Sequence, residues 1–147
     1  IAAQGVQAYL VQGDVAGLDV ASNDLAAARL EQQAIYDGLK RSNGDVNPYA
    51  LHAELADVMW NNCGIWRVQK DLLAAQEKLD ELTDKTKRFA LLDDSGWMNQ
   101  AVPFARSVTA MIEQAKAIVG GAIARDESRG AHFKMDTPAR DDQNWLK

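Results

Sequence analysis

The feature that most constrains the fold is a run of helix-forming residues from Gln100 to Glu127, whose apolar side chains recur every three or four positions. Pro103 lies in the first turn of this run, where a missing backbone N–H breaks no helical hydrogen bond. The spacing predicts a long amphipathic helix. Gly120 and Gly121 each cost a helix roughly 1 kcal/mol relative to alanine, so we expect another backbone to approach them closely. The expected apolar stripe consists of Phe104, Val108, Met111, Ala115, Ile118, Val119, Ala122 and Ile123.

The rest of the sequence predicts further helices and no sheet. Asn47 is a good N-cap and Pro48 suits the first position of a helix that ends before Gly64. Other helices are expected over residues 1–12, 22–39 and 71–89, the last with Glu81–Lys85 and Asp84–Arg88 ion pairs. Clean alternation of apolar and polar residues is missing, which predicts an all-α fold. We expect an up-down-up three-helix bundle, similar to a spectrin repeat, over residues 47–130, with additional N-terminal helices and an irregular tail over 131–147.

Composition excludes several classes of function. The net charge is −5 and the isoelectric point is near 4.9, which argues against a nucleic-acid partner. A single cysteine, Cys63, rules out an internal disulfide and a CxxC metal or redox site, and we expect its thiol to be buried and inert. No apolar stretch approaches the roughly 18–20 residues that a membrane-spanning helix needs.

The sequence offers no convincing catalytic or metal site. Ser128 has Asp126 and His132 nearby, but the G-x-S-x-G turn of a nucleophile elbow is missing. His52, Cys63 and His132 are scattered singly rather than at the spacing of metal ligands. We therefore assign no catalytic, cofactor-binding or metal-binding residue.

Charged residues are dense after residue 124. Arg129 could make a two-pronged bond to a carboxylate, and Gly130 could adopt the left-handed conformation that ends the long helix. Two roles are open for this region: a self-satisfied network that fixes the tail, or contact with a ligand or another domain.

Two tail motifs, Glu127-Ser128-Arg129-Gly130-Ala131-His132 and the run from Pro138 to Lys147, closely resemble the C-terminal signature of succinate dehydrogenase and fumarate reductase flavoprotein subunits. The pattern Asn47-x-Tyr49-x-Leu51-His52 and the segment Asp94-Ser95-x-Trp97-x-Asn99-Gln100 resemble the starts of bundle helices in that family. The resemblance implies a structural role for the signature residues Glu127, Ser128, Arg129, Gly130, His132, Arg140, Asp141, Asp142 and Trp145.

The resemblance also implies what this chain lacks. In the family, FAD and the substrate-binding residues belong to domains that precede the helical domain, and this chain has no G-x-G-x-x-G phosphate cradle. The chain starts at Ile1 without a methionine, so a fragment is expected, with residues 1–46 forming the end of the flavin domain and a connecting helix. The parent would oxidise succinate to fumarate through FAD and pass electrons to an iron–sulfur subunit and on to quinone. It would lie in the cytoplasm, held by a membrane anchor on the inner face of the bacterial cell membrane.

Two alternatives are a C-terminal domain of L-aspartate oxidase, which shares the E-S-R-G-x-H element, and a stand-alone helical adaptor. The R-D-D-x-N-W-L-K ending favours the succinate dehydrogenase branch over L-aspartate oxidase. An apolar patch on Val6, Tyr9 and Leu10 predicts self-association of the isolated fragment.

Overall fold

A computed structural model describes residues 23–93 and 95–146. The chain divides after Gly38 into two units, each described by itself. The helix expected over residues 1–12, with Val6, Tyr9 and Leu10, lies outside the described residues. The described elements are α2 (Asn23–Lys40), α3 (Pro48–Asn62), β1 (Trp66–Arg67), α4 (Gln69–Thr86), α5 (Ala101–Ala124), β2 (Phe133–Lys134) and α6 (Asp142–Trp145).

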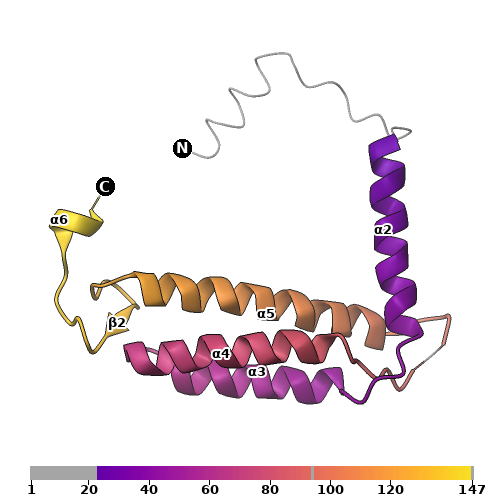
Figure 1. Cartoon of the computed structure of the whole chain (residues 1–147), viewed down its shortest axis with the longest axis horizontal. Helices are drawn as coiled ribbons and strands as arrows, with labels where there is room; N and C mark the ends of the chain where they lie inside the picture. The colour runs from indigo at the N-terminus through magenta and orange to yellow at the C-terminus, as the bar shows by residue number, and fades with distance from the viewer. Residues whose placement is uncertain (1–22, 94, 147) are drawn as a thin grey trace, which may run out of the picture. The chain divides into compact units, whose positions relative to one another are not determined.

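Helices α3, α4 and α5 pack lengthwise against one another, each antiparallel to the next in sequence (Figure 1). Their shared core contains Leu72, Leu79 and Leu82 of α4, each with 0% of its surface exposed. Apolar residues at helical spacing on α3 and α5 complete the core. The predicted three-helix bundle is confirmed. Two members of the predicted α5 stripe are wrong, because Met111 and Ile118 are exposed and Ile112 is buried instead.

The predicted caps of α3 and the break after it are confirmed. The Asn47 Oδ1 accepts a hydrogen bond from the Tyr49 backbone N–H at 2.8 Å, and Pro48 is the first helical residue. Cys63 follows the helix and is buried, which raises the pKa of its thiol. Thiolate chemistry is therefore disfavoured at this position.

Helix α4 ends earlier than predicted because the chain after it becomes extended. The N–H of Val46 donates to the Arg88 carbonyl, and the N–H of Ala90 donates to the Val46 carbonyl. Phe89 is thereby turned into the core with no exposed surface. A side chain at Gly44 would collide with the backbone of Arg88, so the close approach of these two segments requires glycine there.

Helix α5 also ends earlier than predicted, at Ala124 rather than Glu127. Arg125 is already extended, and its N–H donates to the Gly121 carbonyl. The expectation about the two α5 glycines is wrong among the described residues: a methyl group on Gly120 or Gly121 would meet no neighbour within 4 Å.

The tail is more regular than predicted. Strand β2 pairs in parallel with β1, with Trp66 opposite Phe133 and Arg67 opposite Lys134. The short α6 follows Asp141, whose side chain accepts the N–H groups of Gln143 and Asn144.

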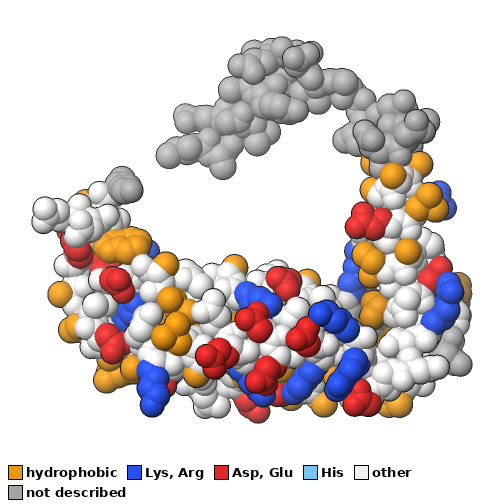
Figure 2. Space-filling view, viewed as in Figure 1, with side chains coloured by type: hydrophobic (Ala, Val, Ile, Leu, Met, Phe, Trp, Pro, Cys, Tyr) orange, Lys and Arg blue, Asp and Glu red, His pale blue; other side chains and the backbone are white. Residues whose placement is uncertain are grey.

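The predicted ion pairs along α4 are wrong. Lys85 reaches across to the half-buried Glu54 on α3, at 2.7 Å between its Nζ and Oε2, while Glu81 pairs with Lys78 at 2.6 Å. Arg88 instead pairs with Asp45. Figure 2 shows side chains of both charges mixed along the bundle. None of the described helices is long and apolar enough to cross a membrane.

Candidate functional site

The signature residues gather at the end of the bundle where α4 begins and α5 ends. We call residues 125–146 the signature segment; it follows α5 and includes β2 and α6.

Glu127 is the centre of the segment and has 0% of its surface exposed. Its Oε1 accepts from Arg125 Nη2 at 2.6 Å and from Arg129 Nε at 2.7 Å. Its Oε2 accepts from Arg129 Nη2 at 3.0 Å and from the Asp141 backbone N–H at 2.8 Å. The two-pronged Arg129 contact predicted from sequence is present, and its acceptor is Glu127.

The arginines keep the Glu127 carboxylate ionised. The hydrogen bond from Arg129 lowers the pKa of Glu127 to about 2, against the opposing effect of burial, with help from the Asp141 N–H and Arg125. The same contacts raise the pKa of Arg129. This carboxylate therefore cannot act as a general acid near neutral pH.

Arg129 extends the network to α6. Its Nη2 lies 2.7 Å from Asp142 Oδ1, and Arg140 Nε donates to the same oxygen at 2.5 Å. These hydrogen bonds, from Arg140 first and Arg129 second, lower the pKa of Asp142. The Trp145 ring lies under the Arg125 guanidinium, 5.3 Å from Cζ to the ring centroid, a cation–π contact.

Ser128 and Gly130 shape the backbone. The Ser128 Oγ donates to the Thr137 carbonyl at 2.8 Å and accepts the Lys134 N–H at 2.9 Å. Gly130 has a φ of 60°. The left-handed conformation predicted for Gly130 is thus present, but it forms a tight turn between Arg129 and His132, whose backbones pair, rather than ending α5.

His132 does not join Ser128 in a catalytic pair in the described structure. Its Nδ1 lies 2.6 Å from Arg67 Nη1, while the Ser128 Oγ is occupied by backbone groups. Burial first, and then the nearby Arg67, lower the pKa of His132. The neutral imidazole is therefore the form present at neutral pH.

Sequence reasoning missed Lys134, which is 1% exposed. Its Nζ donates to the carbonyls of Ile123 at 3.1 Å and Arg125 at 3.2 Å, and to Asp126 Oδ1 at 2.8 Å. The ammonium group thus caps the C-terminal end of α5. At the other helix, Asp136 Oδ2 accepts the N–H of Gln69, the first residue of α4, at 2.6 Å. The signal available in the sequence was a lysine shortly after a helix that lacks a basic residue in its last turn.

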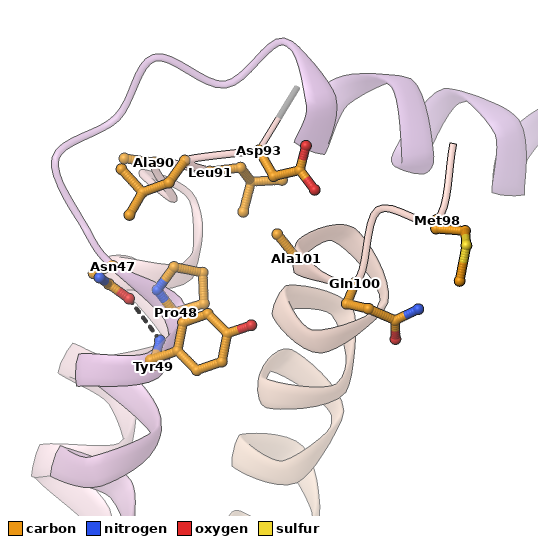
Figure 3. Close-up of a pocket in the computed structure, with 10 residues that line it drawn as sticks. Asn47, Pro48, Tyr49, Ala90, Leu91, Asp93, Met98, Gln100 and Ala101 are labelled. Carbon is orange, nitrogen blue, oxygen red and sulfur yellow. Dashed lines mark hydrogen bonds between the residues drawn. The ribbon is translucent and has the colours of Figure 1, made fainter. Parts of the chain in front are cut away.

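Two of the pockets lie at opposite ends of the bundle. The pocket of Figure 3, about 270 Å³, lies where α3 and α5 begin, and Asn47, Tyr49, Asp93 and Gln100 are among its lining residues. Asn47 and Asn99 already bond the first N–H groups of these helices. A larger pocket of about 470 Å³ lies beside the exposed Trp60 and Trp66. Across residues 23–93 and 95–146, no three His, Cys, Asp or Glu side chains gather as a metal site.

Comparison with known proteins identifies the relatives of this chain. Residues 52–147 match the family model described as the C-terminal region of the fumarate reductase flavoprotein. The succinate dehydrogenase flavoprotein subunit of Bacillus subtilis is 33% identical over 138 residues, which is 90% of this chain and 24% of that protein. The fumarate reductase flavoprotein subunit of Haemophilus influenzae is 32% identical, over 94% of this chain and 25% of the relative.

Solved structures agree with these sequence matches. A quinol–fumarate reductase with menaquinol molecules superposes with a TM-score of 0.80 at 30% identity, over 97% of this chain and 25% of the matched chain. An Escherichia coli quinol fumarate reductase gives a TM-score of 0.80 at 29% identity, over 92% of this chain and 23% of its own. The chain spans about a quarter of the length of the curated relatives it matches. It is a member of the fumarate reductase and succinate dehydrogenase flavoprotein family and corresponds to the C-terminal helical region of those proteins.

Proposed function

We propose that this chain is the helical domain of a subunit that interconverts succinate and fumarate through FAD. FAD and the groups that react with substrate belong to the part of the subunit outside this chain. An iron–sulfur subunit takes the electrons and passes them toward quinone, and a membrane anchor holds the assembly on the inner face of the bacterial membrane. The observation that carries this proposal is the family match to residues 52–147, in relatives about four times as long.

The contacts of the signature segment favour a structural role for its charged side chains. Glu127 receives five hydrogen bonds, all from residues 125–141. Arg129 bonds both Glu127 and Asp142, and the Lys134 ammonium group donates to a carbonyl at the end of α5. Groups with their hydrogen-bonding capacity used internally fix the tail on the bundle instead of binding substrate.

One bundle face suits contact with the flavin-binding part. The ion pairs described for side chains of α3, α4 and α5 all include a residue of α4, such as Lys78–Glu81, Lys85–Glu54 and Lys116–Asp80. The groove between α3 and α5 is instead lined by uncharged and mostly apolar residues, with Met111 and Ile118 left exposed: His52, Leu55, Ala56, Met59, Met111, Gln114, Ala115 and Ile118. Exposed apolar surface of this kind marks a contact site. We assign the α3–α5 groove to the flavin-binding part, because the relatives carry that part in the same chain.

A chimeric subunit tests the proposal. The last quarter of the Bacillus subtilis subunit is replaced by this chain, and flavin content and succinate oxidation are measured beside those of the isolated chain. The chimera is expected to hold flavin and oxidise succinate, and the isolated chain to do neither. Flavin binding by the isolated chain, or a folded chimera that neither holds flavin nor oxidises succinate, would contradict the proposal.

The groove is tested with a matched pair of substitutions in the chimera. Ile118 is 53% exposed in the groove, and Leu73 is 45% exposed on α4. Ile118→Glu is expected to reduce flavin retention and activity, because it places a charge in a desolvated contact, whereas Leu73→Glu leaves both unchanged. Equal effects of the two substitutions would exclude the groove while leaving the family-level function intact.

A further inference from the structure

His132 is held as a hydrogen-bond acceptor. Arg67 Nη1 lies 2.6 Å from its Nδ1, and Arg67 Nε donates to the Gly64 carbonyl at 3.0 Å, which orients the guanidinium group. Since arginine stays protonated and only donates, Nδ1 must offer a lone pair, and the ring hydrogen must reside on Nε2.

Three cations act on His132 electrostatically. Arg67 of β1, Arg125 after α5 and Lys134 of β2 each lower the pKa of its ring, Arg67 the most of the three. The carboxylates of this region are already paired with those cations, Glu127 with Arg125 and Asp126 with Lys134. The carbonyl of Arg125 favours a charged imidazole, and burial opposes it.

The Arg67–His132 contact stands where the signature segment joins the rest of the bundle. Next to it, the Met135 N–H donates to the Arg67 carbonyl at 2.8 Å, and β1 pairs with β2. One residue further, Asp136 accepts the first N–H of α4. These few bonds attach residues 132–136 to β1 and α4.

We propose that His132 is an acid-sensitive clasp: a proton on Nδ1 turns the acceptor for Arg67 into a second donor, and residues 132–136 detach from β1 and from the start of α4. Arg67 Nη1 and a protonated Nδ1 cannot share a hydrogen bond, and the added charge joins three cations. The buried core of α3, α4 and α5 is not part of this opening, so the change is local.

The difference in the pKa of His132 between the closed and open forms sets the pH range over which the segment opens. Burial and Arg67 lower the pKa of His132 from its ordinary 6.5 in the closed form, while the opened segment titrates at the ordinary value. Above pH 6.5 the pH has little effect on the clasp, because neither form takes up the extra proton to a large extent. As the pH falls from there toward the lowered pKa, the open form binds a proton that the closed form does not, and opening increases.

Amide hydrogen exchange of Met135 in the full chain measures the opening, corrected for the intrinsic pH dependence of exchange. The protection factor is expected to be constant above pH 6.5 and to fall by up to about tenfold per pH unit below it. In His132→Asn the amide oxygen can stand near the position of Nδ1 and accept from Arg67 without titrating, so protection should stay constant. His52→Asn alters the exposed histidine of α3 and should keep the wild-type pH dependence.

An equal fall of protection in His132→Asn, or constant protection in the wild type, would overturn the clasp. The ring nitrogen shifts of wild-type His132 give a second test that depends on no variant. They should report the Nε2–H form at pH 7.5 and a pKa below 6.5. An Nδ1–H form, or a pKa at or above 6.5, would also overturn it.

Discussion

Replacing Lys134 by methionine measures what the signature segment contributes to the bundle. The side chain is 1% exposed, and its Nζ donates to the carbonyls of Ile123 and Arg125 and to Asp126. Methionine fills a similar volume but leaves both carbonyls at the end of α5 without a partner. Asp126 can return to water, since its side chain is 71% exposed.

The expected loss follows from those two carbonyls. An unsatisfied buried acceptor costs ~1–3 kcal/mol, and a cation at a helix C-terminus contributes ~0.3–1 kcal/mol. Relief from burying the ammonium group offsets part of this. We expect Lys134→Met to lower the free energy of unfolding by about 2–4 kcal/mol, or roughly 5–15 °C in melting temperature for a domain of this size.

Urea denaturation followed by helical circular dichroism gives the free energy directly, with equal m-values as the condition for comparing the variants. Lys87→Met is the matched control, because Lys87 also forms an ion pair but is 70% exposed. It should change the stability by no more than about 0.5 kcal/mol. A Lys134→Met protein as stable as this control would refute the capping role.

Two further predictions concern the same unit. Because the pKa of Glu127 is about 2 in the folded chain and 4.5 ordinarily, the unfolded chain binds a proton between these values that the folded chain does not. The stability that Glu127 provides is complete above pH 4.5 and is lost as the pH falls toward 2; acid titration of unfolding in Glu127→Gln should lack this step, and an unchanged acid profile would contradict it. Gly44→Ala should destabilise the bundle by about 1–3 kcal/mol, since its Cβ would meet the Arg88 backbone, and urea denaturation should show no loss for Gly96→Ala, where nothing lies nearby.

The features predicted correctly from the sequence are those that depend on neighbouring residues. The 3.6-residue spacing located α3, α4 and α5, and Asn47 with Pro48 marked the start of α3, because caps and periodicity act over a few neighbouring residues. The missed features depend on residues far apart in sequence. Lys85, for example, pairs with Glu54, which is 31 positions away, and not with a neighbour on its own helix.

The signature segment shows the same difference between local contacts and contacts between distant residues. Motif resemblance selected Glu127 and Arg129, whose two-pronged contact spans only two positions. Lys134 carries no motif, and its partners at the end of α5 are defined only when the chain turns back at Gly130. The exposure of Met111 and Ile118 was not predicted. Periodicity identifies the apolar face of a helix, but it does not show how much of that face the neighbouring helices cover.

We propose that the signature residues hold this domain together and take no part in the reaction. The melting temperature of Arg129→Ala in the isolated chain is the sharpest test, because Arg129 joins Glu127 to Asp142 within the chain itself. We expect a melting temperature several degrees below the wild type, and a chimeric subunit whose succinate oxidation falls only as its folded fraction falls. An unchanged melting temperature together with loss of succinate oxidation in the folded chimera would contradict it.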